Sequence, residues 1–398
     1  MGRSKKSRTT QGAGRKSTAS KPTICLAMIV KDEEKDIIRC LESVIPHIDY
    51  WVIFDTGSSD NTIQVIKDFM KANNKPGELH ESEWKDFSTN RNEVLEVADK
   101  KADFTMCMDA DDYLKVKGNI RDMVGPSHHK YLASFVMNDS MVFDRAFMFK
   151  NGHGIRYTGV LHEYLIAPPD MKVNLAKLSQ VVVNASSSPL KRASTTQEKY
   201  ANDAAVLLKD YERDPTNPRT VFYMAQSYRD AQMYDEAIKW YKKRIEMEGW
   251  DQEVYYSKLE LAACSARNKS EDKDVMELYL DAWDYRPYRL EAIYNVAKYN
   301  RHKKRYRTAY ALSAAAMGYF SQFGGKDNLF VNSSVENWLM MDEYCINAYM
   351  CNEVEVAYLN TKLLMESSQW DVVPKDEKER IEKNMSFYKE KYFSEKKK

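Results

Sequence analysis

The chain lacks three features that would each assign it to a large class of proteins: many glycines, a large net charge and a long apolar run. Only 14 of its 398 residues are Gly, which argues against an all-β protein with many tight turns. The formal net charge is +1 although 30% of the residues are charged, so no field of one sign marks a nucleic-acid binder. No apolar stretch approaches the roughly 20 residues of a membrane-spanning helix. We therefore expect no nucleic acid partner and no membrane span.

Signatures of metal-binding cysteines and of glycine-rich phosphate loops are missing too. The six cysteines include no CxxC pair, and most lie in apolar, periodic surroundings. This pattern favours buried free thiols and a reducing, cytoplasmic location. Neither GxxxxGKS/T nor a strand followed by GxGxxG occurs, and these are the usual phosphate-binding loops. A metal ion and a basic side chain would then have to hold any bound phosphate.

A cluster of carboxylates follows a short apolar stretch near residue 105. Phe104–Met108 has the character of a strand buried on both faces, and Asp109, Asp111 and Asp112 come directly after it. Three carboxylates at the end of a buried strand repel one another and are costly to desolvate, and a divalent cation would relieve that cost. Taken alone, the cluster is more typical of an ordinary turn than of a metal site, because Asp favours turns and helix N-caps.

The preceding residues favour the ligand site over the ordinary turn. Strands predicted at Thr23–Val30 and Tyr50–Phe54 alternate with helical patterns, which indicates a parallel sheet. Each of them is followed by a polar cluster, Asp32–Glu34 after the first and Asp55–Asp60 after the second. The carboxyl ends of parallel strands lie at one edge of the sheet, where such folds bind their ligands. We therefore expect three polar loops to converge on a site for an anionic, phosphorylated ligand.

Four segments carry a resemblance to a known family: Ala27–Glu34, Asp55–Asp60, Phe87–Asn92 and Met108–Asp111. In this order and spacing they resemble successive motifs of family-two glycosyltransferases of the GT-A fold, in the branch that carries C-terminal tetratricopeptide repeats. The resemblance implies a mostly parallel α/β sheet with flanking helices, followed by an all-α solenoid. It also implies a metal-dependent transfer of a sugar from a nucleotide diphosphate sugar to an acceptor hydroxyl, with inversion at the anomeric carbon, and we expect the sugar to be a hexose.

The resemblance also implies which residues form the site. Asp55 would bind the nucleotide base, Arg91 would approach the diphosphate, and Asp109 and Asp111 would hold Mn²⁺ or Mg²⁺. A UDP-sugar is the favoured donor. The full set implied for the nucleotide sugar is Val30, Asp32, Glu33, Asp55, Arg91, Asp109 and Ala110.

Residues 131–184 have an alternating pattern of strands, one of which we expect at Ile155–Ile166. This strand contains His162 and Glu163, which correspond to a His-Glu pair in the relatives. An inverting transfer needs a carboxylate near the acceptor hydroxyl, so we expect Glu163 to be the catalytic base and His162 to be a third metal ligand. Without the resemblance, a packed histidine and a solvated carboxylate are equally good interpretations. Neighbouring side chains on a strand point to opposite faces, so we expect the pair to lie in a loop rather than on a regular strand. Asp139 and Asp144 are the other candidates for the base.

One position departs from the family pattern. Relatives often end the last strand of this region with a histidine, whereas this chain has Asn184. If that histidine helps to bind the metal in relatives, its absence either weakens the metal assignment or leaves the role to His162.

Beyond the Ser186–Pro189 linker the chain is helical. Small residues recur twelve apart, as tetratricopeptide repeats place them: Ala225 and Ala237, Ala297 and Ala309, Cys345 and Ala357. The stretch Gly318–Asn332 breaks the period and predicts a long loop. We expect a disordered basic tail at 1–21, a glycosyltransferase domain at 22–186 and a repeat domain at 187–392, which could hold a protein or glycan acceptor. Two other functions stay open: a repeat-based adaptor with an inactive domain, and a nucleotidyltransferase or phosphohydrolase.

Overall fold

The computed structural model describes residues 21–137, 141–185 and 196–396. These residues form two compact units, and the chain passes from one to the other after Thr158, after Tyr164 and after Ser187. Gly159–Tyr164 therefore belongs to the second unit, an excursion that the sequence did not predict. The predicted basic tail, apart from Lys21, and the predicted linker at 186–189 lie outside the described residues.

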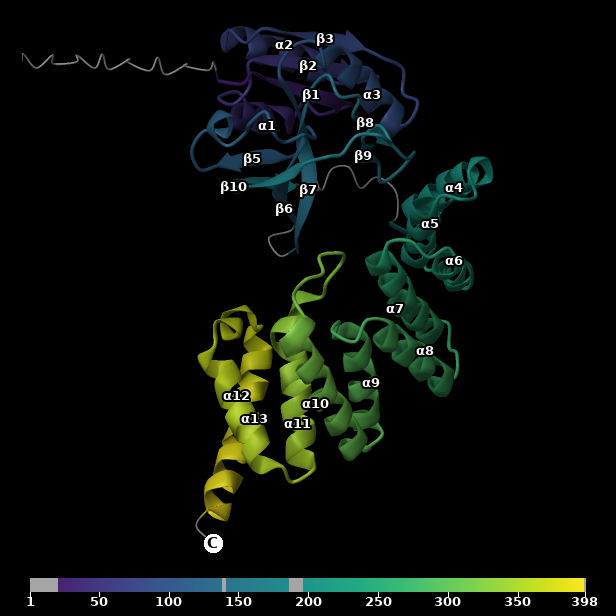
Figure 1. Cartoon of the computed structure of the whole chain (residues 1–398), viewed down its shortest axis with the longest axis vertical. Helices are drawn as coiled ribbons and strands as arrows, with labels where there is room; N and C mark the ends of the chain where they lie inside the picture. The colour runs from purple at the N-terminus through teal and green to yellow at the C-terminus, as the bar shows by residue number, and fades with distance from the viewer. Residues whose placement is uncertain (1–20, 138–140, 186–195, 397–398) are drawn as a thin grey trace, which may run out of the picture. The chain divides into compact units, whose positions relative to one another are not determined.

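The first unit is built on one eight-stranded sheet, with a separate two-stranded ribbon (Figure 1). The order across the large sheet is β3-β2-β1-β4-β7-β6-β10-β5, and β8 pairs with β9 in the ribbon. The strands are β1 Ile24–Val30, β2 Tyr50–Asp55, β3 Gly77–Glu81, β4 Phe104–Cys107, β5 Tyr113–Val116, β6 Lys130–Met137, β7 Met141–Lys150, β8 Arg156–Thr158, β9 Tyr164–Ile166 and β10 Leu175–Ala185.

Helices cover both faces of the parallel part of this sheet. They are α1 Ile37–Val44, α2 Thr62–Ala72 and α3 Phe87–Ala98. Along β1 the side chains alternate: Leu26 and Met28 pack in the cluster that contains the apolar faces of α1 and α2, whereas Cys25 and Ala27 pack with α3. Because β1 is buried on both faces, it has no polar side chain, as the sequence predicted. Truncating Leu26 to Ala would cost roughly 2–5 kcal/mol of stability.

The register of the sheet places the polar loops at one edge. β1 runs parallel to β2, with Val30 opposite Asp55, and parallel to β4, with Ala27 opposite Cys107. The loops that follow β1, β2 and β4 therefore leave the sheet on the same side. The predicted fold class and the predicted convergence of the three loops are both confirmed.

The expected strand at Ile155–Ile166 is wrong as a single element. It is two three-residue strands, β8 and β9, separated by Gly159–Glu163. Gly159 has φ +99° and His162 has φ +53°, so the backbone turns twice where a strand would run straight. The expectation that His162 and Glu163 lie in a loop is confirmed.

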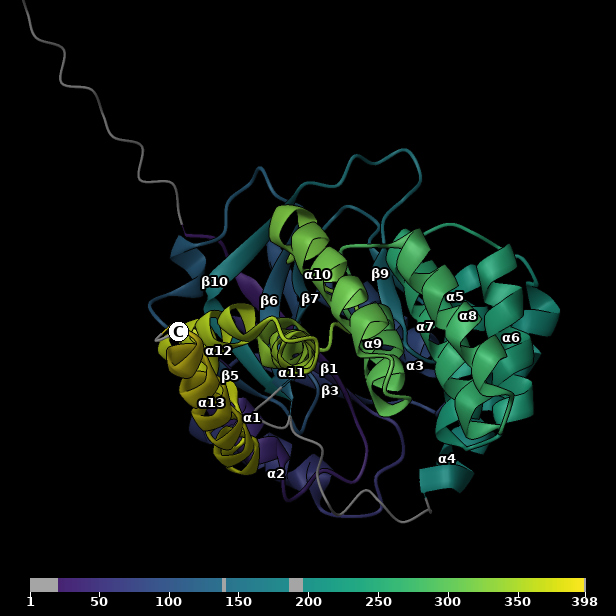
Figure 2. The same cartoon turned by 90° about the horizontal axis from the view of Figure 1, so that it is seen from below.

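The second unit is a series of helices that pack against their neighbours in the sequence (Figures 1 and 2). They are α4 Thr196–Arg213, α5 Pro218–Asp230, α6 Tyr234–Glu246, α7 Asp251–Arg267, α8 Asp272–Tyr285, α9 Glu291–His302, α10 Tyr306–Phe323, α11 Met340–Met350, α12 Val354–Glu366 and α13 Lys375–Glu395.

The twelve-residue spacing of small side chains has the meaning that the sequence predicted. Each pair joins two consecutive helices: α5 with α6, α9 with α10, and α11 with α12. All six residues are buried, five of them completely and Cys345 to within 1%. Small side chains at these positions let the two helices of a repeat approach closely. The predicted solenoid is confirmed.

The predicted loop at Gly318–Asn332 begins later than expected, because Gly318 lies inside α10, which runs to Phe323. A helical Gly costs only about 1 kcal/mol relative to Ala, and Met317 and Phe320 on either side pack against the core of the unit. The remaining loop is fixed by Asp327, which accepts hydrogen bonds from Arg286 and Arg289.

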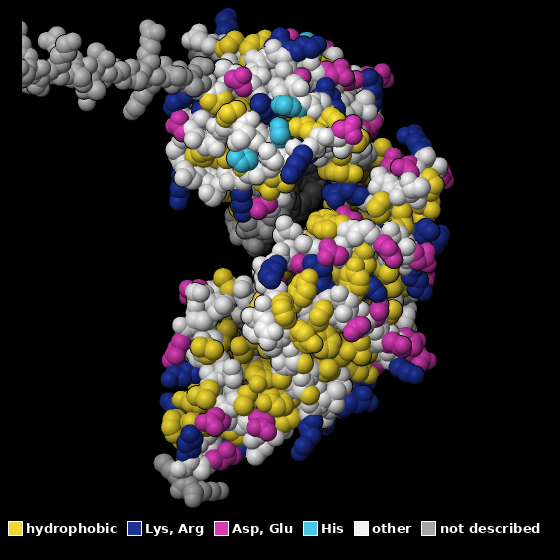
Figure 3. All heavy atoms as spheres, viewed as in Figure 1, with side chains coloured by type: hydrophobic (Ala, Val, Ile, Leu, Met, Phe, Trp, Pro, Cys, Tyr) yellow, Lys and Arg dark blue, Asp and Glu magenta, His cyan; other side chains and the backbone are white. Residues whose placement is uncertain are grey.

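The surface of the chain carries both signs of charge. In Figure 3, the Lys and Arg side chains are interspersed with Asp and Glu on the face shown, in keeping with the small net charge. Among the described residues, no helix has both the length and the apolar character needed to cross a membrane.

Candidate active site

The loops after β1 and β2 are tied together by hydrogen bonds between their polar residues. Ser59 donates to Asp32 Oδ1 from its backbone N–H at 2.7 Å, and the Asp32 N–H donates to Ser58 Oγ at 2.9 Å. These bonds hold Asp32 at φ +54°, a conformation rare for residues other than Gly. The Glu33 N–H donates to Thr62 Oγ1 at 2.7 Å, at the start of α2. The two loops thus form one rim, with Val30 buried beneath it.

Asp55 lies at the end of β2, and only one of its two carboxylate oxygens is hydrogen-bonded. The residue is 2% exposed. Its Oδ1 accepts the backbone N–H groups of Gly57 at 3.0 Å and Ser58 at 2.8 Å, and Gly57 makes the turn possible with φ +100°. Its Oδ2 is buried and has no hydrogen-bond partner in the structure. A buried acceptor without a donor is costly, so this oxygen is suited to accept an N–H from a ligand.

Arg91 reaches this edge from α3, whose N-cap is Asp86. Its Nη2 lies 2.5 Å from Asp109 Oδ1, and its guanidinium lies over the ring of Tyr157 at 5.4 Å. The next residue, Asn92, donates to the carbonyl of Tyr157 at 2.9 Å and accepts its N–H at 2.8 Å, which fixes β8 against α3. Arg91 is therefore held in place both at its tip and along its side.

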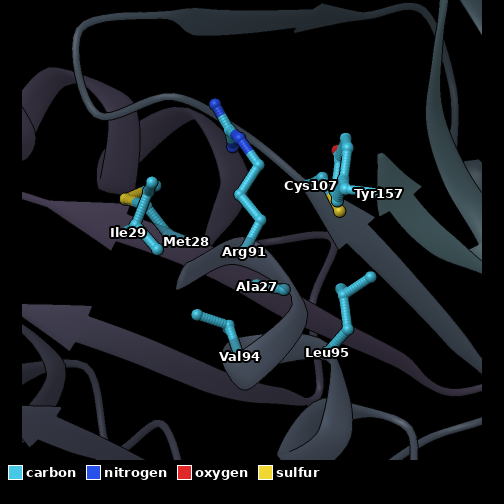
Figure 4. A pocket seen from close by; sticks show the side chains of 8 residues that line it. All are labelled: Ala27, Met28, Ile29, Arg91, Val94, Leu95, Cys107 and Tyr157. Carbon is cyan, nitrogen blue, oxygen red and sulfur yellow. The ribbon is translucent and has the colours of Figure 1, made fainter. Parts of the chain in front are cut away.

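A small pocket lies under the stem of Arg91. Figure 4 shows Arg91 rising between Met28 and Ile29 on one side and Cys107 and Tyr157 on the other. Burial raises the pKa of both the Cys107 thiol and the Tyr157 hydroxyl, so both are neutral at pH 7. The pocket is lined mainly by apolar side chains, and we interpret it as support for Arg91 rather than as a ligand site.

The structure adds a residue that sequence reasoning missed. Arg145, on β7, places Nη1 3.5 Å from Asp109 Oδ2. The antiparallel pairing of β4 with β7 explains this contact: Met106 lies opposite Met148 and Phe104 lies opposite Lys150. The same register, continued by three residues, brings Arg145 opposite Asp109. The sequence alone does not reveal that these two strands pair.

Asp109 is therefore a carboxylate between two guanidinium groups. Burial acts to raise the pKa of Asp109, but the charges of Arg91 and Arg145 outweigh it and hold the pKa well below its usual range. Ala110, next in the chain, is buried in the core at 3% exposure. The backbone carbonyl of Asp111 accepts a hydrogen bond from Arg39 Nη2 at 2.7 Å, so the loop after β4 is also anchored to α1.

The carboxylates after β4 fit a hard divalent cation in part. Among the residues that the structure describes, no three His, Cys, Asp or Glu side chains are grouped as metal ligands. Mg²⁺ in nucleotide-binding sites commonly takes one or two carboxylates and completes its shell with phosphate oxygens and water. Asp109 and Asp111 supply that number of carboxylates, and a third protein ligand is not required.

His162 and Glu163 belong to the second unit, whereas Asp109 and Asp111 belong to the first. The His162 ring stacks on Tyr223 of α5 with centroids 3.9 Å apart and planes 9° apart. Desolvation, and then the charges of Arg219 and Lys199, lower the pKa of His162 to about 4 although the residue keeps an exposed edge. The histidine is therefore neutral at pH 7, and its role as a metal ligand stays a prediction.

The structure describes Asp144, one of the two other candidates for the base, and also Asn184. Asp139 lies outside the described residues. Asp144 accepts a hydrogen bond from Ser134 at 3.0 Å and pairs with Lys177 at 2.9 Å, so its carboxylate is already committed. Asn184 lies opposite Tyr113 in the ladder of β10 with β5, next to the loop after β4, and its side-chain Nδ2 is buried without a partner.

A protein-family model matches the part of the chain that contains these loops. Residues 25–147 match the family model described as Glycosyl transferase family 2. The chain carries a family 2 glycosyltransferase domain at its N-terminus. The matched range contains Asp55, Arg91, Asp109 and Arg145.

The chain is also similar to individual proteins. The SPbeta prophage-derived glycosyltransferase SunS of Bacillus subtilis is 27% identical over 245 residues, covering 56% of this chain and 53% of SunS. A TPR repeat-containing protein of Synechococcus elongatus is 34% identical over 97 residues, covering 24% of this chain and 22% of that protein. The chain thus spans about half the length of SunS. Among solved structures, S. aureus TarS is similar with a TM-score of 0.35 and 14% identity, over 64% of this chain and 54% of TarS.

Proposed function

We propose that the chain is a metal-dependent glycosyltransferase that moves a sugar, a hexose by expectation, from a nucleotide diphosphate sugar to an acceptor hydroxyl. The observation that carries the proposal is the grouping of Asp55, Arg91 and Asp109 at one edge of a family 2 glycosyltransferase domain. The first relative, SunS, is described as a glycosyltransferase, which supports the same reaction class.

The donor binds through complementary polar groups. The buried Oδ2 of Asp55 accepts an N–H from the base, and uracil offers such an N–H on its pairing edge, which makes a UDP-sugar the favoured donor. Val30, Asp32 and Glu33 form the rim beside the base. Arg91 binds the diphosphate, where a guanidinium gives short, charge-assisted hydrogen bonds.

The other polar groups at this edge of the sheet would stabilise the negative charge on the leaving diphosphate. Mn²⁺ or Mg²⁺ held by Asp109 and Asp111 would offset the charge that builds on the leaving oxygens. Arg91 assists because it is preorganised by Tyr157 and Asp109 before the donor arrives.

Glu163 is the proposed base that takes the proton of the acceptor hydroxyl, with inversion at the anomeric carbon. Its segment is held on α5: the Arg219 guanidinium lies over the rings of Tyr164 at 4.6 Å and Tyr223 at 4.9 Å. His162 stacks on the same Tyr223. The helical unit is the proposed binding region for a protein or glycan acceptor. We place the reaction in the cytoplasm, where nucleotide sugars are available.

A panel of nucleotide sugars tests the proposal. Wild-type protein is incubated with UDP-, GDP- and TDP-sugars and Mn²⁺ or Mg²⁺, and the products are separated. Release of a nucleoside diphosphate and free sugar, lost in Asp109→Asn, supports the proposal. Release of a sugar phosphate identifies a nucleotidyltransferase or phosphohydrolase instead. Absence of binding to every nucleotide identifies a repeat-based adaptor with an inactive domain.

A further inference from the structure

Two arginines from different elements share one carboxylate at the donor edge. Arg91 of α3 approaches Oδ1 of Asp109 at 2.5 Å, and Arg145 of β7 approaches Oδ2 at 3.5 Å. Each guanidinium also lies over an aromatic ring at 5.4 Å, Arg91 over Tyr157 and Arg145 over Phe135. Both cations are therefore oriented from two sides, which a chance surface ion pair is not.

The two arginines differ in how firmly they are held. The side chain of Arg91 is 8% exposed, whereas that of Arg145 is 35% exposed and its contact with Asp109 is 1.0 Å longer. If a ligand competes for Asp109, the Arg145 contact is given up before the Arg91 contact, because it is longer and its side chain is more exposed. A guanidinium that turns toward a diphosphate gains a charge-assisted hydrogen bond that a neutral group cannot supply.

We propose that Arg145 is a second diphosphate-binding residue, which turns from Asp109 Oδ2 to an oxygen of the β-phosphate when the donor binds. The inference rests on the proposed function and adds to it a residue that neither the motifs nor the comparisons assign. Asp109 would then have two roles: it holds both arginines ready in the empty site, and it exchanges Arg145 for the ligand on binding.

Calorimetric titration with UDP and with UMP, each with and without Mn²⁺, tests this. UMP keeps the base, ribose and α-phosphate but lacks the β-phosphate. We expect Arg145→Met to weaken UDP about 10- to 100-fold, the range for one hydrogen bond to a charged group. UMP should lose less than about threefold, so the preference for UDP over UMP collapses. Arg145→Lys keeps the charge without the planar fork and should lose less than Arg145→Met.

Arg121→Met is the matched control. Arg121 also pairs with an aspartate of the first unit, Asp49, at 2.9 Å, but Asp49 precedes β2 and so lies at the opposite edge of the sheet from Asp109. This variant should keep the wild-type affinities for UDP and UMP.

Three results would overturn the inference. Unchanged UDP affinity in Arg145→Met means that Arg145 only braces Asp109. An equal loss for UMP and UDP means that it acts through the shape of the site rather than on the β-phosphate. If wild-type protein binds neither nucleotide, nor any other nucleoside diphosphate, the proposed function fails and this inference fails with it. The first two results leave the proposed function standing. Where Arg145→Met does not fold, Arg145→Gln, which also removes the charge, gives the same comparison.

Discussion

Asp55→Asn separates recognition of the donor base from maintenance of the fold. The substitution keeps the shape of the side chain and leaves one oxygen to accept the N–H groups of Gly57 and Ser58. At the other branch it replaces the buried, unpartnered Oδ2 with an amide NH₂, which donates and cannot accept. An N–H of the base would then face another donor.

The magnitude follows from these contacts. A hydrogen bond to a charged group is worth about 1.5–3 kcal/mol, so UDP and UMP should both bind roughly 10- to 100-fold more weakly. Stability should change little. The amide weakens the two turn hydrogen bonds, but the substitution also removes a carboxylate oxygen that is buried without a partner, which is costly. We expect the free energy of unfolding to stay within about 1 kcal/mol, or within about 4 °C in melting temperature for a unit of this size.

Calorimetry and thermal unfolding measure the two effects independently. Asp103→Asn is the control, because Asp103 is a carboxylate at the opposite end of β4 that accepts from the Thr23 N–H at 2.8 Å. It should not alter nucleotide affinity. Unchanged UDP affinity in Asp55→Asn would refute the role in base binding. A fall of more than about 10 °C in melting temperature would show that Asp55 is a structural residue instead.

Four further predictions concern the metal, the base, its support and the division into units. Asp111→Asn should abolish the Mn²⁺-dependent part of UDP affinity while the protein still folds, because the amide lacks the charge that a hard cation needs; calorimetry checks this. Glu163→Gln should lower donor turnover by roughly 100-fold, as for loss of a general base, with unchanged UDP affinity. Tyr223→Leu removes the ring under His162 and should lower donor turnover but not UDP affinity. Tyr223→Phe keeps the ring and should keep donor turnover near the wild-type value. A fragment of residues 21–187 should bind UDP but turn over the donor poorly, because Val160 and Leu161 lose the core against which they pack.

Each of these predictions has a result that contradicts it. Retention of metal-dependent affinity in Asp111→Asn removes Asp111 from the site. Collapse of UDP affinity with normal turnover in Glu163→Gln makes Glu163 a donor ligand. Tyr310→Leu is the control for Tyr223→Leu, because it breaks the stacked pair of Tyr310 with Tyr344 elsewhere in the helical unit. If the two variants lose donor turnover equally, the cause is a general loss of stability. A fragment that does not fold shows that the two units share a core.

The sequence predicted what depends on local pattern. The apolar run at Phe104–Met108 predicted a buried strand, because a strand buried on both faces has few polar side chains. The acidic residues after it predicted that this strand ends at the ligand-binding edge, because ligands bind at the carboxyl ends of parallel strands. The spacing of Ala225 and Ala237 likewise predicted a helical repeat, since two antiparallel helices need small side chains where they meet.

The sequence did not predict what depends on contacts between distant segments. Arg145 is 36 positions from Asp109 and meets it only through the antiparallel pairing of β4 with β7. The segment that carries Glu163 has an alternating pattern typical of a strand, yet it leaves the sheet to pack on α5, where Tyr223 and Arg219 hold it. Packing in the tertiary structure overrides strand propensity at that point.

The most direct test of the account is the position of the bond that breaks. Donor turnover in water enriched in oxygen-18, followed by mass spectrometry of the products, reports which atom the water attacks. If the chain is a glycosyltransferase using water in place of its acceptor, attack falls on the anomeric carbon, so the label is found in the released sugar and the nucleoside diphosphate carries none. Label in a phosphate group would show attack on phosphorus, and would contradict the assignment of this site to sugar transfer.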